Sequence, residues 1–289
     1  MAAGKPVWSA RKLPTGVAEV SCPWVNRIGW EQWFLLSSDR HWDNPKSDHK
    51  LQADHLNEAV KRGAGIIDCG DFFCAMQGTG DPRGHKGAIR PEHNKDHYLD
   101  ALVETCSDWI RPWDQHFVLI GKGNHETKVM ARKETDLTAR LCHDMTLRGS
   151  PVVCGEYNSW VRIRFRQDGQ KCRTFSIKVY HGTGGGGAST RGAQAINTHA
   201  TWWPDADIVV SGHIHHTWHV PVARECLTTS GEVVEKIQHH LSCPTYKREW
   251  GTSGFSVERG FGPRPIGAYW LRFYRKGNQE IGVQAILAD

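Results

Sequence analysis

The sequence has no apolar run approaching the ~20 residues that a membrane-spanning helix needs. It also lacks internal repeats and low-complexity tracts, which excludes solenoids and disordered linkers. Residues 1–15 carry basic side chains but no apolar core, unlike a secretory signal. No Walker loop is present, because no Lys-Ser or Lys-Thr pair follows the glycine-rich run 182–187 in register. We therefore expect a protein without a membrane span, located in the cytoplasm, or in the host cytoplasm if it is virus-encoded.

Charge and cysteine content narrow the class further. The formal charge of +5 suits an anionic substrate, with nucleic acid as one option, but it is far below that of a strongly basic binding protein. Nine cysteines form an odd set at irregular spacing, which indicates reduced, buried thiols rather than a disulfide framework. Of the 13 tryptophans, most are expected to pack in the core or at its rim, and a minority to offer a stacking surface for a base.

Hydrophobic periodicity predicts alternating strands and helices in the first half of the chain. The predicted strands there are 33–37, 66–68 and 117–120, and the predicted helices are 48–62, 95–110 and 134–147. The second half is richer in strands, with a hairpin, one helix and three further strands, at 160–180, 191–202, 207–210, 233–241 and 268–274. This order predicts two stacked sheets flanked by helices. We expect a single domain over 1–289, with an N-terminal arm at 1–30 and a loop- and strand-rich C-terminal extension at 220–289.

Five polar motifs each follow a β-like hydrophobic run. They are Asp39-Arg40-His41, Gly70-Asp71, Gly123-Asn124-His125-Glu126, Tyr180-His181-Gly182 and Gly212-His213-Ile214-His215. Strand ends are where an α/β sheet presents functional side chains, so we expect the motifs to converge on one rim. The competing interpretation is a set of unrelated core and turn histidines in a chain that has 17 of them. Two Asp, one Asn and four His suffice for two divalent metals that share one carboxylate.

Over residues 30–220 this ordered pattern resembles the calcineurin-like metallophosphoesterase superfamily, in its small intracellular or bacteriophage-type form. The resemblance implies a four-layer αββα sandwich of two mixed sheets flanked by helices. It also implies two metals bridged by Asp71, one held by Asp39, His41 and His215 and the other by Asn124, His181 and His213. Manganese is the first choice for both ions, with iron, zinc or nickel as alternatives, because these ligands suit all four.

His125 directly follows a predicted ligand, so its side chain is expected to project toward the substrate. In the superfamily the matching histidine protonates the leaving oxygen, and such general acid catalysis is worth roughly 10²–10⁴-fold. The alternative is a structural histidine behind the ligands. Glu126 is expected to orient a metal-binding imidazole through its free N–H. His213 and His215, two residues apart on a segment expected to be extended, should point the same way and reach adjacent metals.

Two features of the protein serine/threonine phosphatase branch are missing. Phe72 and the residues after it stand where that branch has a second Asp and an Arg, and Lys122 stands where it has another Arg. The His-x-His form of the last motif is similar to the diesterase and nuclease-type branches instead. The resemblance therefore favours phosphodiesters of nucleotides or short nucleic acid. The alternatives are a phosphomonoesterase on a small metabolite or nucleotide, and a metal-binding scaffold without catalysis.

Several residues are candidates for substrate contact. Asn124 and Arg191 are expected to touch the substrate phosphate, and Lys122, Arg83 and Lys86 to contact flanking phosphates. For Arg191, an ordinary solvent-facing position at a helix start is an equal alternative. The sequence makes no prediction about the oligomeric state.

Overall fold

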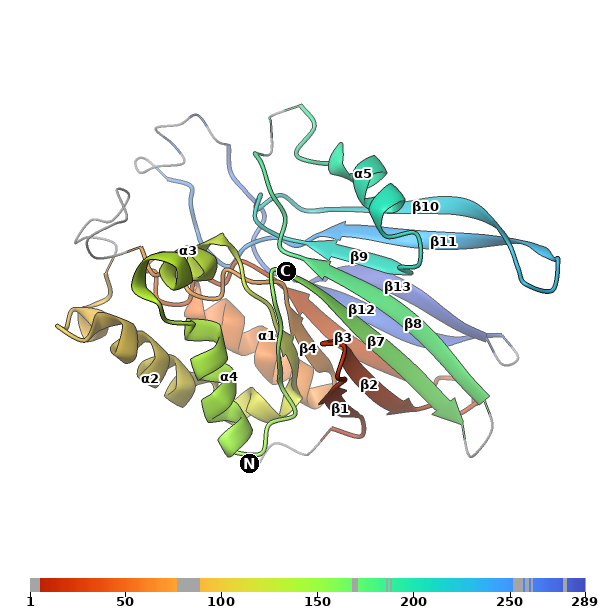
Figure 1. The fold of residues 1–289 in the computed structure, drawn as a ribbon, viewed down its shortest axis with the longest axis horizontal. Helices are drawn as coiled ribbons and strands as arrows, with labels where there is room; N and C mark the ends of the chain where they lie inside the picture. The colour runs from red at the N-terminus through yellow and green to blue at the C-terminus, as the bar shows by residue number, and fades with distance from the viewer. Residues whose placement is uncertain are drawn as a thin grey trace.

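Two β-sheets packed face to face form the centre of the molecule, with helices on their outer sides (Figure 1). The computed structural model describes residues 6–76, 89–167, 171–185, 187, 189–251, 257, 260, 262–277 and 280–288. Within this part, no helix is long and apolar enough to cross a bilayer. Both sheets are mixed, which confirms the predicted α/β sandwich.

The larger sheet has seven strands, in the order β1-β2-β7-β8-β9-β11-β10. In that order they are β1 (Ser9–Lys12), β2 (Ala18–Pro23), β7 (Asn158–Gln167), β8 (Lys171–Tyr180), β9 (Ile208–Ser211), β11 (Val233–Ser242) and β10 (Trp218–Leu227). β7 and β8 form the predicted antiparallel hairpin, with Val161 opposite Ile177. Its predicted turn at Asp168-Gly169 lies outside the described residues.

The smaller sheet has six strands, in the order β13-β12-β3-β4-β5-β6. In that order they are β13 (Glu280–Ala288), β12 (Ala268–Gly277), β3 (Glu31–Ser37), β4 (Gly65–Asp68), β5 (Phe117–Ile120) and β6 (Val153–Cys154). β3 to β6 are parallel neighbours, so their carboxyl ends lie at one edge. Every residue of β4 and β5 is buried, as expected for strands covered on both faces.

Alternating side chains of β7 fill the space between the sheets. Val161, Ile163 and Phe165 point inward and are fully buried. Phe165 meets Phe273 of the other sheet with ring centroids 5.0 Å apart, and Phe34 lies against the same ring. The residues between them in sequence point outward, so the predicted period of two holds along this strand.

Four helices lie beside the smaller sheet and one lies on the larger sheet (Figure 1). They are α1 (His49–Lys61), α2 (Tyr98–Ile110), α3 (Asn124–Lys133), α4 (Leu137–Leu147) and α5 (Ala195–Trp202). The 3₁₀ turns η2 (Pro91–His93) and η3 (Arg111–His116) flank α2. The Asp48 carboxylate caps α1 by accepting from Leu51 N at 3.0 Å, and the helix stops before Gly63, as predicted.

The helix predicted over 134–147 starts later, and a helix that was not predicted precedes it. Glu134 adopts a left-handed conformation, with φ 53°, and ends α3. The Asp136 side chain then accepts from Ala139 N at 2.9 Å and starts α4. The sequence did not predict α3 because its N-cap residue is Gly123, which has no side chain to act as the Ser, Thr, Asp or Asn cap that usually marks a helix start.

The two ends of the chain differ from what was expected. Residues 1–30 were expected to form an arm, but they supply β1 and β2, whose Ala18 and Val20 are fully buried. The 220–289 extension is likewise part of both sheets, since β11 pairs with β9 and β12 pairs with β3. β1 is short and β2 alternates over only a few residues, whereas β11 and β12 lack the strict alternation that marks β7. The assignment of 1–289 to one domain stays a prediction.

Candidate metal centre

The predicted ligands meet where strands of both sheets end. They come from the loops after β3, β4, β5, β8 and β9, and are Asp39, His41, Asp71, Asn124, His181, His213 and His215. Six of the seven fall into two groups whose candidate ligand atoms lie within 4.8 Å of one another, namely Asp39, His41 and His215, and Asp71, His181 and His213. Four of the seven side chains, Asp39, His41, Asp71 and His181, are buried, and the other three, Asn124, His213 and His215, are half-buried.

In the first group, three acceptor-capable atoms face one point. His41 Nε2 and His215 Nε2 are 3.3 Å apart, and Asp39 Oδ1 lies 3.1 Å from the latter and 3.9 Å from the former. Two neutral imidazole nitrogens that face each other can share only one proton, whereas a cation satisfies both lone pairs. Nitrogen and carboxylate ligands of this kind suit Mn, Fe, Zn and Ni.

The second group leaves a buried nitrogen that a cation would satisfy. His181 Nε2 lies 3.2 Å from Asp71 Oδ2, but it makes no hydrogen bond and is shielded from solvent. His213 Nδ1 lies 2.7 Å from Asn124 Oδ1, which brings the predicted asparagine into this group. A buried polar atom that makes no hydrogen bond is costly, so this nitrogen, which faces the Asp71 carboxylate, fits a metal ligand. Both groups therefore fit the predicted ions.

Polar contacts behind the histidines aim their Nε2 atoms. His181 Nδ1 lies 3.1 Å from the Cys69 carbonyl oxygen, and His215 Nδ1 lies 3.2 Å from Glu249 Oε2. Lys247 Nζ in turn holds that carboxylate at 2.6 Å. Such partners fix the tautomer of a ligating imidazole and raise its basicity. Sequence reasoning missed Glu249 because it lies in a loop beyond all five motifs, with no pattern around it.

Backbone strain is concentrated at the ligands. Outside glycine, eight described residues have positive φ, and five of them are the predicted ligands Asp39, His41, Asp71, His213 and His215. Each such conformation costs about 1–3 kcal/mol and persists only where the surrounding structure imposes it. This pattern is unusual for a set of ordinary turn histidines, so it favours a functional site over the competing interpretation.

The last motif reaches both groups by a different route from the one predicted. The segment from His213 to His215 was expected to be extended, but β9 has already ended at Ser211 and both histidines are left-handed, with φ 69° and 55°. The backbone turn, rather than strand alternation, directs the two rings into different groups. A Cβ at Gly212 would overlap Ser38 Oγ and lie 2.5 Å from Asp39 Oδ2, so only glycine permits this approach.

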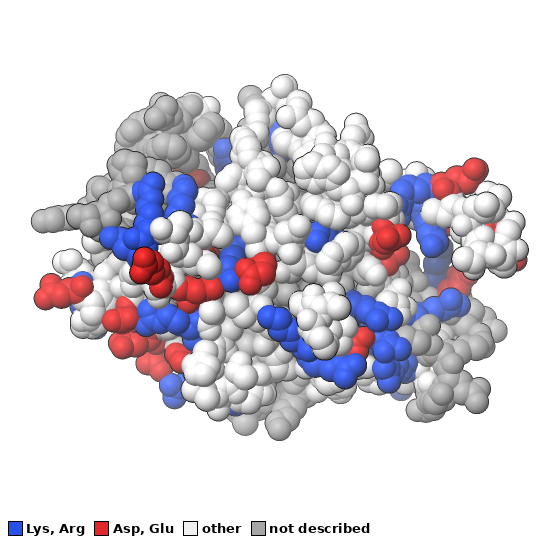
Figure 2. All heavy atoms as spheres, viewed as in Figure 1, with Lys and Arg blue, Asp and Glu red and all other residues white. Residues whose placement is uncertain are grey.

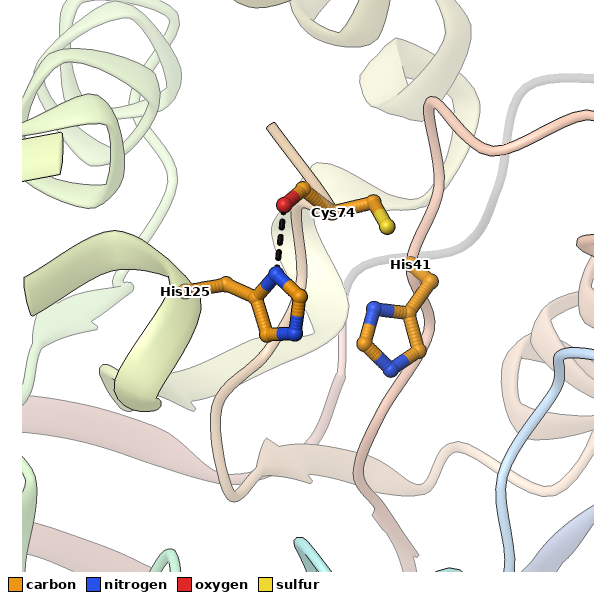
Figure 3. A group of neighbouring side chains, drawn as sticks. All are labelled: His41, Cys74 and His125. Atoms are coloured by element: carbon orange, nitrogen blue, oxygen red, sulfur yellow. Dashed lines mark hydrogen bonds between the residues drawn. The ribbon is translucent and has the colours of Figure 1, made fainter. Parts of the chain in front are cut away.

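His125 is aimed at the centre from the first turn of α3. Its Nδ1 lies 2.5 Å from the carbonyl oxygen of Cys74 (Figure 3). A carbonyl only accepts, so Nδ1 carries a proton and Nε2 is the nitrogen that gains or loses one. Nε2 lies 3.8 Å from Asp71 Oδ2, and the ring stands 4.9 Å from that of His41. His41, Cys74 and His125 also form a third group with candidate ligand atoms within 4.8 Å.

A buried carboxylate that was not predicted holds the Cys74 backbone in place. Asp43 accepts hydrogen bonds from Cys74 N at 2.5 Å and from Ala75 N at 2.9 Å. The Tyr98 hydroxyl donates to the same carboxylate at 3.3 Å. Ala75 is held at φ 44°, a left-handed conformation that this pair of bonds stabilises. Asp43 therefore sets the position of the carbonyl that His125 contacts.

Glu126 has a different role from the predicted one. Instead of orienting an imidazole, its carboxylate accepts from the backbone N–H groups of Asp71 at 3.2 Å, Phe73 at 2.8 Å and Gly123 at 2.8 Å. It thus ties the loop after β4 to the start of α3. A Cβ at Gly123 would overlap the Asp71 carboxylate, so the glycine allows these two loops to touch. Burial and the charge of Asp71 raise the pKa of Glu126 to about 8.

The carboxylates of Asp71 and Asp39 favour the protonated forms of His181 and His215. Burial alone would lower the pKa of His181, but the charge of Asp71 and its contact outweigh burial and raise that pKa to about 9. At His215, Asp39 likewise overcomes burial, and the pKa rises to about 9. Both imidazoles are therefore stabilised by positive charge at Nε2, which is the charge that a bound cation supplies.

The predicted phosphate contacts are only partly placed. Lys122 is buried and bound by Asp136 and Glu156, each at 2.8 Å, so it is not free to meet a phosphate. Arg191 is exposed, and Gly192 after it packs so closely on Ile214 that a Cβ there would overlap the isoleucine. Substrate contact by Arg191 and by Asn124 stays a prediction. Arg83 and Lys86 lie outside the described residues.

No family model matches the chain, and no curated protein matches its sequence. Solved structures to which it is similar include a protein from Streptococcus pneumoniae described as a predicted phosphoesterase, with TM-score 0.34, 13% identity, and coverage of 89% of this chain and 90% of that one. Vps29 complexed with zinc, from Entamoeba histolytica, has TM-score 0.36, 11% identity, and coverage of 89% and 99%. A metallophosphoesterase from Sphaerobacter thermophilus has TM-score 0.34, 12% identity, and coverage of 89% and 90%.

At 11–13% identity and TM-scores below 0.5, these likenesses carry no argument about the family or the activity of this chain. The chemistry of the site therefore rests on its own side chains.

Proposed function

We propose that this protein is a dinuclear metal-dependent phosphoesterase. The observation that carries the proposal is the pair of Asp- and His-containing groups at one rim, with the His125 ring aimed between them. Six of the side chains hold the ions, namely Asp39, His41 and His215 for one, and Asn124, His181 and His213 for the other. Asp71 lies in the second group, beside His181 and His213, and is proposed to bridge to the ion of the first group as well. When bound, two divalent ions neutralise phosphate oxygens and acidify a water molecule toward hydroxide.

His125 is proposed to supply the proton that the departing oxygen needs. The Cys74 carbonyl keeps the proton on Nδ1, so Nε2 is presented to the side where the substrate binds. Burial of the ring and its contact with Asp71 limit its rotation. A group held in one tautomer and one orientation donates without first having to reorient.

Phosphodiesters of nucleotides or short nucleic acid are the proposed substrates, with small phosphomonoesters as the runner-up. The His213-Ile214-His215 form of the last motif supports the first choice. So does the absence of the phosphatase-type Asp, since Cys74 stands near that point and contributes its carbonyl. We propose a cytoplasmic location and manganese as the preferred ion.

The test compares two chromogenic esters with added Mn²⁺. We expect bis-p-nitrophenyl phosphate to be hydrolysed faster than p-nitrophenyl phosphate. If a monoester, including a nucleoside monophosphate, is hydrolysed about tenfold faster than any diester, the phosphomonoesterase function replaces the proposed phosphodiesterase function. If neither ester nor any nucleotide is hydrolysed by protein that holds two ions, a non-catalytic metal-binding scaffold is the better description.

A further inference from the structure

The outer face of the larger sheet is left largely uncovered, in contrast to the outer face of the smaller sheet. α1, α2 and α4 contribute to the cluster of apolar residues on the smaller sheet, whereas α5 is the one helix on the larger sheet in the described part of the chain. Figure 2 shows basic side chains gathered over the region where Figure 1 places β2 and β7. An uncovered sheet face of this kind is a candidate binding surface.

Strand register identifies the side chains on this face. Arg162, Arg164 and Arg166 alternate with the buried residues of β7, so all three point outward. Residues on one face of a strand recur every ~6.6 Å, which makes the three guanidinium groups a straight, evenly spaced row. An extended strand of nucleic acid presents its phosphates in a row of comparable spacing.

The charge on this face is strongly of one sign. On the outward positions of β1, β2, β7 and β8 that the structure describes, there are four arginines, Arg11, Arg162, Arg164 and Arg166, and one buried lysine, Lys178, against one carboxylate, Glu19. A solvated sheet face ordinarily mixes both signs. Glu19 is buried and lies within 2.7 to 3.6 Å of three of the arginines, so it fixes their positions without cancelling their charge. An open cavity of about 360 Å³ lies beside it, between Arg11 and Arg166.

Aromatic rings stand at the end of the row nearest the metal centre. Trp160 is the next outward residue of β7, and Lys178 Nζ lies 4.6 Å from its ring and 5.2 Å from that of Trp203. Trp202, at the end of α5, packs edge-on against Trp203 yet is 60% exposed. Lys178 lies only three residues before the ligand His181. Cationic rows that end in exposed tryptophan are typical of surfaces that bind single strands by phosphate contact and base stacking.

We propose that the outer face of β1, β2, β7 and β8 binds a single strand of nucleic acid and leads it toward the metal centre. From Arg166 to the end of β8 this face spans roughly 27 Å, since the partner of Arg166 lies eight positions before Tyr180. A mononucleotide is too short to cover that length. The proposal deepens the proposed function by naming a polymeric diester, but the binding surface is tested without reference to turnover.

The experiment measures binding of a labelled oligothymidylate by fluorescence anisotropy over a series of salt concentrations. The triple variant Arg162→Gln, Arg164→Gln, Arg166→Gln is expected to bind at least about tenfold more weakly at low salt. The slope of log affinity against log salt should fall by about 2, because each phosphate contact contributes roughly 0.7 on a single strand. The matched control is Lys50→Gln, Lys61→Gln, Arg111→Gln, which removes the same charge from exposed positions on the opposite, helical side. It should bind as the unaltered protein does.

A second variant avoids any question of folding. Trp202→Ala changes an exposed side chain and is expected to weaken binding by about fivefold or more, with Trp202→Phe restoring most of it. Equal losses in the arginine triple and the lysine-containing control would overturn the proposal, as would affinity for polyglutamate or duplex DNA equal to that for the single strand. Circular dichroism and thermal unfolding confirm that each variant is folded. Diester hydrolysis by the unaltered protein reports separately on the proposed function.

Discussion

His125 Nδ1 and the Cys74 carbonyl oxygen are 2.5 Å apart, which fixes both the tautomer and the direction of the imidazole that faces the metal centre. The contact joins α3 to the loop after β4, two segments more than fifty residues apart in the chain. The position of the proposed acid therefore depends on backbone atoms as much as on its own side chain.

His125→Ala should keep its metals and lose most of its turnover, because the ring adjoins the ligands without belonging to either of the two main groups. We expect kcat to fall roughly 10²–10⁴-fold on a diester with a poor leaving group, and less on a p-nitrophenyl ester, which needs no proton. Metal analysis and the two rates check this, with exposed His143→Ala as control. Loss of metal from the variant would make His125 a ligand and the acid role wrong.

Asp43→Asn should act on catalysis at a distance, as the change of a positioning residue. An amide cannot accept from both Cys74 N and Ala75 N, so the Cys74 carbonyl loses part of its support. We expect kcat to fall about tenfold and the basic limb of its pH profile, which reports the general acid, to shift, with KM and metal content little changed. A variant with an unchanged pH profile and kcat would show that Asp43 serves only the fold of this loop.

Asp71→Asn should be more damaging than the loss of any one histidine ligand, because the carboxylate is proposed to serve both ions. Metal content is expected to fall below one ion per chain, whereas His181→Ala should retain the ion of the first group. Inductively coupled plasma analysis of the two reconstituted variants provides the comparison. Retention of one full ion by Asp71→Asn would place Asp71 in a single site and remove the bridge.

Acid should destabilise the fold through two neighbouring histidines of β11. Burial lowers the pKa of both His239 and His240 to about 4, below the value of about 6.5 for an unfolded chain. Between those values the unfolded state binds more protons, so their contribution to stability is complete above pH 6.5 and is lost as the pH falls toward 4. Thermal unfolding at pH 7 and pH 5 measures this loss.

His240→Gln removes one of these titrating groups while keeping a side chain that can bond Gln238, the partner of His240 Nε2 at 3.0 Å. Its melting temperature should fall less between pH 7 and pH 5 than that of the unaltered protein. Exposed His143→Gln should leave the pH dependence as it was. Identical pH slopes for all three proteins would contradict the assignment.

The sequence was most informative where chemistry follows directly after a buried strand. β3, β4 and β5 are parallel neighbours, so their carboxyl ends share an edge, and Asp39, Asp71 and Asn124 had to arrive there together. The apolar run before each motif was enough to predict this. The inward and outward alternation of β7 was predicted for the same reason, since one of its faces is buried along its whole length.

Other parts of the site leave no local trace in the sequence. Glu249 meets His215 across a loop, and Asp43 acts through two backbone N–H groups, so neither depends on a spacing that a motif could record. The sequence predicted that Lys122 contacts a phosphate, but the tertiary structure places the carboxylates of Asp136 and Glu156 against its ammonium group. β1 and β2 escaped notice because they are only four and six residues long, so that even the alternation of Ala18, Val20 and Cys22 with Glu19 and Ser21 is too short to stand out from a loop.

The left-handed ligands imply a trade between durability and activity in this protein. Glycine adopts the φ of 69° found at His213 without steric cost, so His213→Gly relieves strain of about 1–3 kcal/mol at that position. The same change deletes a proposed metal ligand. Selection for heat resistance alone would therefore favour replacement of the left-handed ligand residues first. A more thermostable variant that had lost these histidines is expected to have lost its activity as well.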